Sequence, residues 1–394
     1  MVRLAIVASH PIQYHAPVYR ALARRIGVHV FYAHRATPAD QARAGFDVPF
    51  DWDVPLLDGY DHTWLENRAR RPGIHHFFGC NTPGLRRLLP EGGFDGLLVS
   101  GWNKLSYWQA ARAARKVGMP VLVRGDSLLA GPRAWWKRAA KRVAYRPMLA
   151  RFDVFLSPGI RHREYLVSYG VPEERIFFVP HCVDNEFFTE RVGAASMDGG
   201  GVRAGLSVPA GKVVFLLVGK LLPIKRPLDF LQALDILRRM GTDAWGLVVG
   251  DGPMRPQLEA HIRDHATPCT LAGFMNQSAI ATAYAAGDVL VVSSESETWG
   301  LVVNEAMAAG RPAIVSDGCG CAPDLIVPGK TGLVYPMGRP EGLAGAMARM
   351  VEDPDARKSM GRNARERIGG YSIDAACDGV IRGLESVKAG CGRR

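Results

Sequence analysis

The stretch "VLVVSSESETWGLVVNEAMAAGRPAIVS", residues 289–316, carries the pattern that decides the fold. An apolar run at 289–292 ends in a polar cluster, a helical pattern follows at 302–309, and a second apolar run occupies 313–316. A strand, a helix and a second strand in this order predict a βαβ unit of a parallel sheet. The polar loop after the first strand would lie at the carboxyl edge of the sheet, where such sheets bind ligands.

Two glutamates bracket the start of the predicted helix. Glu297 lies in the loop before Gly300, and Glu305 lies about one turn inside the helix. Free N–H groups at a helix start favour a phosphate, and carboxylates accept hydrogen bonds from sugar hydroxyls. The pair therefore fits a phosphate flanked by polyols, which is a nucleotide-sugar. The alternative is a solvated loop residue and a helix surface charge.

A second loop of interest is "VGKLLPIKRP", residues 218–227, which follows a predicted strand at 213–218. Gly219 allows a sharp turn, and Lys220 and Lys225 would place two ammonium groups at the same carboxyl edge. There they would neutralise a diphosphate and stabilise it as negative charge develops on departure. The alternative is that both lysines are solvated. Two further turns at this edge are "VVGDGP" (248–253, with Asp251) and "LAGFMN" (271–276).

The same alternation of strands and helices runs through both halves of the chain and predicts an α/β fold with two doubly wound domains. Further strands are expected at 2–9, 96–100, 120–123, 152–157, 176–180 and 245–249, and helices at 16–25, 107–116, 227–240 and 255–265. The Gly-, Ser- and Ala-rich stretch 191–212 predicts a surface connection. We divide the chain into a first domain (1–185), a second domain (186–372) and a terminal helix (373–394) that packs back on the first domain.

Composition narrows the class of protein. The 394 residues are 47% hydrophobic and 22% charged, which is typical of a globular chain. The sequence contains no apolar run of about eighteen residues, so no helix is expected to span a membrane. The first residues do not resemble a signal peptide, and seven scattered cysteines fit a reducing cytosol. We therefore expect a cytoplasmic protein in which Cys319 and Cys321 are small loop residues.

These motifs resemble the retaining glycosyltransferases of the GT-B fold, family four, also described as glycosyl transferases group 1. The resemblance rests on the glutamate pair within "SSESETWGLVVNEAMAAGRPAIVSDGCG" (293–320), the lysine loop, "VGDGP" (249–253) and "VPHCVDNEFF" (179–188). It implies two Rossmann-like domains that face an interdomain cleft, the first for the acceptor and the second for the donor. The implied activity moves a hexose from a nucleotide-diphosphate-sugar to a glycan, lipid-linked or small-molecule acceptor in bacterial polysaccharide or glycoconjugate synthesis.

The resemblance also assigns roles in the donor site. It implies that Lys220 and Lys225 bind the diphosphate, that Glu297 contacts the donor sugar, and that Glu305 contacts the ribose. The remaining donor-binding residues that it implies are Gly219, Asp251, Phe274, Met275, Gly300, Leu301 and Val302, with Phe274 and Met275 beside the base. The family usually has arginine where Lys220 stands, so the bidentate phosphate contact is lost although the charge is kept. The catalytic residues are then Lys225, Lys220 and Glu297, together with Asp126 of the first domain.

Candidates for the acceptor lie in two first-domain loops. The first turn, "SHPIQYHAPVYRAL" (9–22), is bulkier than the paired glycines frequent in the family, and it supplies His10, Gln13 and Tyr14. The loop in "VLVRGDSLLAG" (121–131) supplies Arg124, which would meet an anionic acceptor, and Asp126, which would orient the acceptor or act as a base. The alternative for Asp126 is that it caps the next turn.

No metal or other cofactor is expected, since GT-B enzymes as a class need none and the nucleotide-sugar is a substrate. The one sequence that suggests a metal is Asp51-Trp-Asp53, because an Asp-x-Asp pair binds a metal in the other large glycosyltransferase fold. That fold is a single domain, whereas the pattern here restarts in the second half of the chain.

Much of the net charge of +11 falls in "RAWWKRAAKRVAYRPMLAR", Arg133–Arg151. A basic helix with tryptophans is suited to an anionic membrane surface, so we expect a peripheral contact with the inner face of the plasma membrane. The alternative is a helix packed on its own domain with a solvated basic face. Two other functions were weighed: a nucleotide-sugar 2-epimerase of the same fold, and a nucleic-acid-binding protein. The basic residues cluster on one helix, so we expect no nucleic-acid partner.

Overall fold

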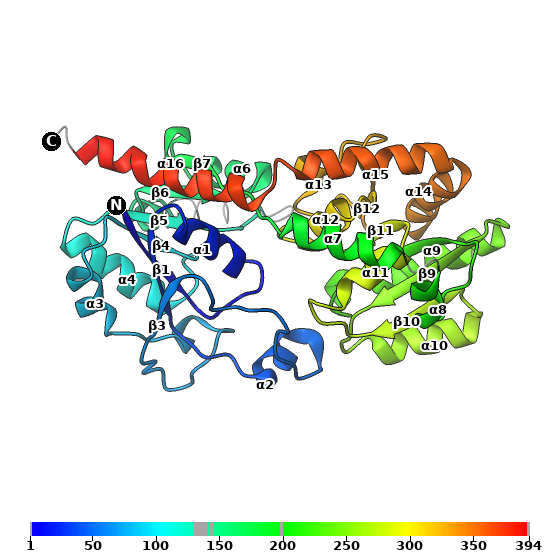
Figure 1. Ribbon diagram of the computed structural model, residues 1–394, viewed down its shortest axis with the longest axis horizontal. Helices are drawn as coiled ribbons and strands as arrows, with labels where there is room; N and C mark the ends of the chain where they lie inside the picture. The colour runs from blue at the N-terminus through cyan, green and yellow to red at the C-terminus, as the bar shows by residue number, and fades with distance from the viewer. Residues whose placement is uncertain (1, 130–140, 142, 144, 198–199, 392–394) are drawn as a thin grey trace. The chain divides into compact units, whose positions relative to one another are not determined.

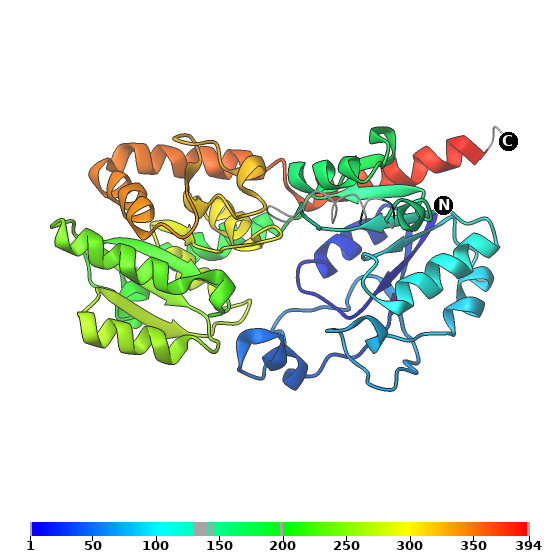
Figure 2. The same cartoon turned by 180° about the vertical axis from the view of Figure 1, so that it is seen from behind.

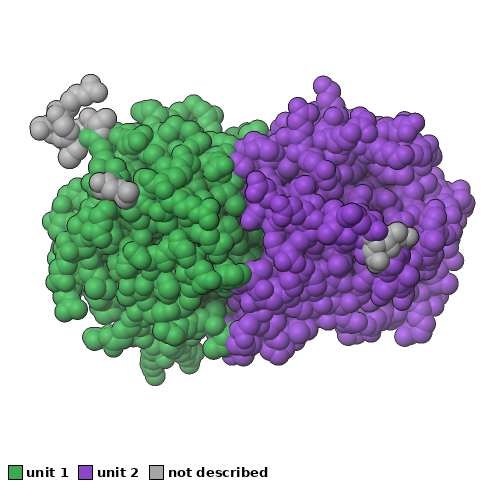
Figure 3. Space-filling view, in the orientation of Figure 1, with its two compact units in different colours: residues 1–37, 55–181, 373–394 green, residues 38–54, 182–372 purple. Residues whose placement is uncertain are grey.

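The computed structural model describes residues 2–129, 141, 143, 145–197 and 200–391. The chain divides into two compact units: unit 1 comprises residues 1–37, 55–181 and 373–394, and unit 2 comprises 38–54 and 182–372 (Figure 3). The chain passes from unit 1 to unit 2 after residue 181 and returns after residue 372. Residues 38–54, which we call the inserted segment, come from the first half of the sequence and belong to unit 2.

Unit 1 is built on a parallel sheet in the order β3-β2-β1-β4-β5-β6-β7. Its strands are β1 (Arg3–Ala8), β2 (Gly27–Tyr32), β3 (Asp61–Trp64), β4 (Gly96–Val99), β5 (Val121–Arg124), β6 (Val154–Ser157) and β7 (Ile176–Phe178). The central strands are continuous apolar runs because helices cover both faces of the sheet. The strand order turns between β1 and β4.

Among the described residues, the helices of unit 1 with given bounds are α1 (Ala16–Ala23), α3 (Leu85–Glu91), α4 (Leu105–Lys116), α6 (Ile160–Ser168) and α16 (Ile373–Cys391), with 3-10 turns at Phe77–Gly79 and Glu173–Arg175. The terminal helix α16 lies beside α1 in both cartoon views (Figure 1 and Figure 2). It also approaches β7 closely, because a Cβ at Gly379 would lie 2.0 Å from the carbonyl oxygen of Phe178. Glycine is therefore required where this helix crosses the end of the sheet.

Unit 2 is a second parallel sheet, in the order β10-β9-β8-β11-β12-β13. Its strands are β8 (Val213–Val218), β9 (Ala244–Val249), β10 (Cys269–Gly273), β11 (Val289–Val292), β12 (Ala313–Ser316) and β13 (Gly332–Tyr335). Numbered within the unit, the order is that of a Rossmann fold, and it turns between β8 and β11. The predicted two-domain α/β fold is confirmed.

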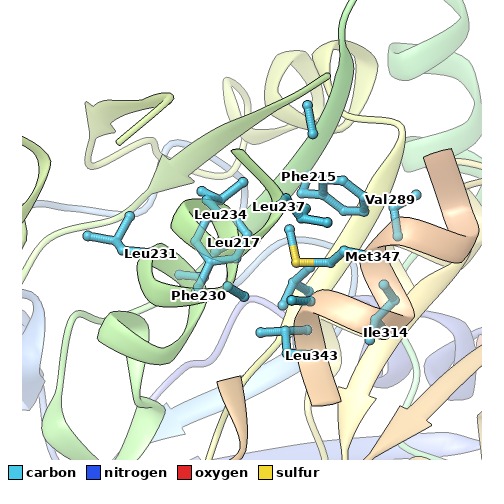
Figure 4. Packing of buried hydrophobic residues seen from close by; sticks show 14 of the residues in the cluster. Phe215, Leu217, Phe230, Leu231, Leu234, Leu237, Val289, Ile314, Leu343 and Met347 are labelled. Atoms are coloured by element: carbon cyan, nitrogen blue, oxygen red, sulfur yellow. The ribbon is translucent and has the colours of Figure 1, made fainter. Parts of the chain in front are cut away.

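The helices of unit 2 are α2 (Pro38–Gln41), α7 (Asn185–Ser196), α8 (Gly201–Gly205), α9 (Pro227–Arg239), α10 (Arg255–His265), α11 (Ile280–Ala286), α12 (Leu301–Ala308), α13 (Ala322–Leu325), α14 (Pro340–Glu352) and α15 (Pro354–Ile368), with a π-helix at Ala42–Phe46 and a 3-10 turn at Pro223–Lys225. Helix α9 shows why these helices form. Proline occupies its first turn, and Phe230, Leu234 and Leu237 recur at helical spacing on its buried face. They pack with Phe215 and Met347 in the core (Figure 4).

Two sequence-based expectations need correction. Residues 191–212 were expected to be a surface connection, but α7 continues through 196 and α8 occupies 201–205. Helix α7 begins before this stretch, where the Asp184 carboxylate caps it by accepting a hydrogen bond from the Phe187 N–H at 3.0 Å. The glycine-rich composition of residues 191–212 concealed the end of α7 and the whole of α8. Strands β2, β3, β10 and β13 were not predicted. Three of them, β3, β10 and β13, are edge strands, and most side chains of β3 and β10 are only partly buried, so the hydrophobic pattern of these two strands is weak.

Candidate functional site

The loops after β8 and β11 lie at the turning point of the unit 2 sheet, where ligands of doubly wound sheets bind. Gly219 and Lys220 follow β8 directly, and Glu297 lies in the loop between β11 and α12. The fold therefore brings the lysine loop and the glutamate loop together, although 72 residues separate Lys225 from Glu297 in sequence.

The contact that joins the two loops is an ion pair between the Lys225 ammonium and the Glu297 carboxylate. The Lys225 side chain is 27% exposed and that of Glu297 is 18% exposed, so the pair is largely shielded from water. The backbone supports it, because the Ser293 hydroxyl donates a hydrogen bond to the Lys225 carbonyl oxygen at 2.8 Å. The two side chains that the sequence assigned to the diphosphate and the sugar thus neutralise each other in this structure.

Lys220, like Lys225, is partly buried. Burial lowers the pKa of Lys220, and the positive charge of Lys225 lowers it further, while the Glu297 carboxylate raises it. Its Nζ lies 4.6 Å from the ring centroid of Phe46, a residue of the inserted segment. An anion placed between the two ammonium groups would relieve their mutual repulsion.

The glutamate loop is held by the loop after β12 through backbone contacts. The Gly320 N–H donates to the Glu297 carbonyl oxygen at 2.9 Å. A Cβ at Gly320 would lie 2.1 Å from the Thr298 carbonyl oxygen, and one at Gly318 would lie 2.3 Å from the Glu295 carbonyl oxygen. Glycine is therefore required at both positions to let the two loops meet.

The two cysteines expected to be small loop residues lie beneath the glutamate loop. Cys319 and Cys321 are fully buried, and the Cys319 thiol donates to the Trp299 carbonyl oxygen at 3.3 Å. Burial raises the pKa of the Cys321 thiol well above its usual value. Both side chains therefore pack as small residues that fill the space under the loop.

Helix α12 begins directly after the glutamate loop. Gly300 precedes it with a φ of 100°, a left-handed conformation that favours glycine. Among the described residues, no side chain caps this helix, so the N–H groups of Leu301 and Val302 are placed as a helix-start anion site requires. Glu305 lies farther along α12, is 2% exposed, and accepts a hydrogen bond from the Tyr284 hydroxyl at 2.5 Å. The two glutamates therefore have different environments.

The turn after β9 supports the lysine loop. The Leu221 N–H donates to the Asp251 carbonyl oxygen at 2.9 Å, and a Cβ at Gly252 would lie 2.9 Å from backbone atoms of Leu221. The Asp251 carboxylate accepts a hydrogen bond from Arg255 at 2.9 Å and another from the Gly252 N–H at 2.8 Å. Asp251 thus shapes the turn through its own contacts.

Phe274 and Met275, expected beside a base, follow β10. The Phe274 ring packs against two rings of the inserted segment, with centroid distances of 4.5 Å to Phe50 and 5.5 Å to Phe46. No local pattern in the sequence predicts this packing of the inserted segment on Phe274. The signal that could have found it is the aromatic run "FDVPFDW", residues 46–52, in a stretch with no strand or helix pattern.

The Asp-x-Asp pair lies in the same inserted segment. The Asp53 carboxylate accepts hydrogen bonds from the N–H and hydroxyl of Ser278, and the Asp51 carbonyl oxygen accepts one from Asn276 at 2.7 Å. Within the described residues no cluster of three or more His, Cys, Asp or Glu could hold a metal ion. The pair therefore makes a protein contact within unit 2.

The acceptor candidates all lie in unit 1: His10, Gln13 and Tyr14 follow β1, Arg124 ends β5, and Asp126 follows β5. Arg124 donates hydrogen bonds to the Pro180 carbonyl oxygen at 3.0 Å and to His181 Nδ1 at 3.3 Å. Its Nε is buried and has no hydrogen-bond partner among the described residues. His10 Nδ1 is hydrogen-bonded to the Ser9 hydroxyl at 2.9 Å. Gln13 and Tyr14 are half-buried in the turn before α1, and Asp126 is exposed.

The positive charge of Arg124 lowers the pKa of three nearby histidines, His15, His162 and His181. Burial first, and the Arg124 charge second, lower the pKa of His15 and of His162 to about 3. The same causes lower the pKa of His181 well below its usual value. His162 and His181 were not predicted, because they follow β6 and β7 and only the fold brings them to Arg124. The cluster is one fixed cation among neutral imidazoles.

The basic segment Arg133–Arg151, which we expect to contact a membrane, lies largely outside the described residues. Within it the structure describes residues 141, 143 and 145–151. The Lys141 ammonium lies over the Tyr145, Tyr169 and Tyr165 rings, at 4.6, 5.1 and 5.3 Å from their centroids. No helix in the part of the chain that the structure describes is long and apolar enough to cross a membrane.

Comparison with known proteins matches both halves of the chain. A family model described as glycosyl transferases group 1 matches residues 202–367, and one described as a glycosyl transferase 4-like domain matches residues 11–182. A GDP-mannose-dependent alpha-mannosyltransferase of Mycolicibacterium smegmatis is 30% identical over 290 residues, 70% of this chain and 69% of that protein. An alpha-D-kanosaminyltransferase of Streptomyces kanamyceticus is 34% identical over 168 residues, 42% of this chain.

The matches span only part of some relatives. The chain covers 43% of the length of the kanosaminyltransferase. A D-inositol 3-phosphate glycosyltransferase of Kineococcus radiotolerans is 27% identical over 308 residues, which are 71% of this chain and 67% of that protein. Among solved structures, Anabaena HepE in complex with UDP superposes with a TM-score of 0.74 at 16% identity, over 98% of this chain and 100% of that one. That likeness shows the fold.

The histidine cluster predicts a pH dependence of stability. The unfolded His162 binds a proton below pH 6.5, whereas the folded side chain does so only near pH 3. Stability is therefore lost as the pH falls from 6.5 towards 3, by about 1.4 kcal/mol per pH unit for such a histidine. Replacing His162 by Gln removes this contribution, so the midpoint of thermal unfolding should fall less steeply between pH 6.5 and pH 5.

The matched control is His75→Gln, because His75 is an exposed histidine of the same unit. Circular dichroism at several pH values measures both variants. A slope in His162→Gln equal to that of the parent and of the control would contradict the buried, neutral state of His162.

Proposed function

Because the chain belongs to the glycosyltransferase family described as glycosyl transferases group 1, we propose that it is a retaining hexosyltransferase. It would move a sugar from a nucleotide-diphosphate-sugar to a glycan, lipid-linked or small-molecule acceptor in bacterial glycoconjugate synthesis. The names of its relatives support this, since they transfer mannosyl and kanosaminyl groups or act on inositol 3-phosphate. The comparisons give no support to a 2-epimerase or to a nucleic-acid-binding protein, and absence of a nucleic-acid partner stays a prediction.

The observation that carries the proposal is the Lys225–Glu297 ion pair beside the uncapped start of α12. A diphosphate entering this site offers Lys225 a doubly charged partner in place of one carboxylate. Glu297 is then released to accept hydrogen bonds from hydroxyl groups of the donor sugar. Binding of the donor thus exchanges an internal ion pair for two donor contacts, and no buried charge is left without a partner.

Cations at the leaving group make the departure of the diphosphate easier. As the bond between the sugar C1 and the diphosphate oxygen breaks, negative charge grows on that oxygen. Lys220, Lys225 and the N–H groups that open α12 stabilise this charge, more strongly in a shielded site than in water. The acceptor hydroxyl oxygen forms its bond to C1 on the same face, and its proton passes to the departing phosphate oxygen. Configuration at C1 is kept without an enzyme nucleophile.

We assign the acceptor to the unit 1 residues His10, Gln13, Tyr14, Arg124 and Asp126. Arg124 favours an acceptor with an anionic group, because its Nε is buried without a partner among the described residues and its neighbouring histidines are neutral. Asp126 is exposed, which suits a group that orients the acceptor hydroxyl while the departing phosphate takes its proton. The lysines supply the positive charge that a metal ion would bring, so we propose a reaction independent of divalent cations.

Lys225→Ala should lower kcat about 10²- to 10³-fold, as loss of a group that stabilises developing charge does elsewhere. Lys225→Arg should keep part of the activity because the charge stays. Release of the nucleoside diphosphate at saturating donor and acceptor, with and without a chelator, measures the effect. Lys330→Ala, on an exposed turn of unit 2, is the control. A change confined to KM would refute the role in departure.

The donor can be identified by its effect on stability. Relatives are named for GDP-mannose, and solved structures of the same fold contain UDP. A panel of UDP-, GDP-, ADP- and TDP-sugars should raise the unfolding midpoint for one base, since a ligand at 100 times its Kd adds about 2.7 kcal/mol. Glu297→Gln should reduce the shift for the nucleotide-sugar more than the shift for the free nucleoside diphosphate. No shift with any member of the panel would contradict the proposed function.

We also propose a peripheral location on the cytoplasmic face of the membrane, supported by the basic residues and tryptophans of residues 133–151. Binding to vesicles that contain phosphatidylserine should be strong at low salt and fall as salt rises, because the attraction is electrostatic. Neutral vesicles and a variant carrying Lys137→Glu and Arg138→Glu are the controls. Equal sedimentation with neutral and anionic vesicles would contradict this location.

A further inference from the structure

The inserted segment reaches unit 2 from the first half of the chain and contacts the loops of the candidate donor site. It consists of α2, the π-helix Ala42–Phe46 and an irregular stretch up to Val54. The acidic pair and the aromatic residues of this segment have no part in the function proposed above. Three sets of contacts with unit 2 define what the segment does.

The first set anchors the segment near the end of β10. The Asp53 carboxylate accepts hydrogen bonds from the Ser278 N–H at 3.0 and 3.2 Å and from the Ser278 hydroxyl. Asn276 donates to the Asp51 carbonyl oxygen at 2.7 Å. Charge-assisted hydrogen bonds of this kind are stronger than neutral ones, so they fix the position of the segment on the turn before α11.

The second set is an aromatic cluster. Phe46, Phe50 and Phe274 pack on one another, with centroid distances of 5.1 Å between Phe46 and Phe50 and 4.5 Å between Phe50 and Phe274. Trp52 packs edge-on against Phe50 at 4.9 Å. Phe50 is only 9% exposed. The cluster is therefore a small apolar core between the inserted segment and the rest of unit 2. It fixes the position of the Phe46 ring.

The third set reaches the lysine loop. The Phe46 ring centroid lies 4.6 Å from Lys220 Nζ. Gly45, with a φ of 103°, lies close to the same loop, since a Cβ there would be 3.2 Å from Leu222 and 3.5 Å from the Lys220 Cδ. The ammonium of Lys220 thus lies over a ring of the segment, and its aliphatic stem passes near Gly45. A flexible lysine held in this way loses less freedom when it binds an anion.

We propose that the inserted segment is a wall of the donor site and that Phe46 is a positioning residue that holds the Lys220 ammonium for the diphosphate of a nucleotide. This inference rests on the proposed function and adds the segment to its donor site. Phe46 acts through Lys220, by a cation–π contact, and Asp53 acts by keeping Phe46 in place. The Asp-x-Asp pair then serves donor binding as an anchor, without a metal ion.

The test is a double-mutant cycle read by calorimetric titration of UDP, GDP and ADP. Phe46→Leu keeps an apolar side chain but removes the ring, and it should raise the Kd of the bound nucleoside diphosphate about fivefold, as loss of one cation–π contact implies. Phe46→Tyr should restore the affinity. In a Lys220→Met background, Phe46→Leu should change the Kd by less than about twofold, because the contact it removes is already absent.

Two further variants separate anchoring from general damage to the fold. Asp53→Ala should raise the Kd about as much as Phe46→Leu, whereas Asp47→Asn, on an exposed residue of the same segment, should leave it unchanged. The donor KM should rise in Phe46→Leu while the acceptor KM stays the same, which a merely structural role would not produce.

The outcomes distinguish this inference from the function on which it rests. If the parent binds a nucleoside diphosphate and Phe46→Leu binds it equally well, or loses equal affinity with and without Lys220, the positioning role is wrong and the proposed function stands. If the parent binds none of the three and no nucleotide-sugar of the panel raises its unfolding midpoint, both are wrong.

Discussion

The ion pair between Lys225 and Glu297 is the constraint on which the site depends. A lysine and a carboxylate that are both largely shielded from water need each other as long as no ligand is present. Neither side chain alone would be stable in this place, and each is suited to a different part of a nucleotide-sugar. The structure therefore holds the two side chains close together, and the proposed function requires that they change partners when a donor binds.

Close backbone contacts with neighbouring turns hold the lysine loop and the glutamate loop in position. Gly318 and Gly320 allow the glutamate loop to lie on the loop after β12, and Gly252 allows the turn after β9 to reach the lysine loop. The strand order of unit 2 places all of these loops at one edge. A positive φ at Gly300 then turns the chain into α12 with its first N–H groups directed out of the helix start. Local glycines and sheet topology together bring the lysine loop, the glutamate loop and the start of α12 to one corner of unit 2.

Much of this could be predicted from the sequence, for physical reasons that the residues show. Buried strands such as β8 and β11 are continuous apolar runs, and α12 follows a glycine, so the βαβ pattern of residues 289–316 was readable. The edge strands β3 and β10 were not, since their side chains are only partly buried. The inserted segment and His162 were missed because long-range contacts, absent from any local pattern, bring them to Lys220 and Arg124.

The central claim is that the diphosphate of the donor displaces Glu297 from Lys225. A crystal structure of the protein with a bound nucleoside diphosphate tests it most directly. The account predicts phosphate oxygens within hydrogen-bond distance of Lys225 Nζ and of the N–H groups of Leu301 and Val302, with the Lys225–Glu297 contact broken. A phosphate bound elsewhere, with that ion pair intact, would contradict it.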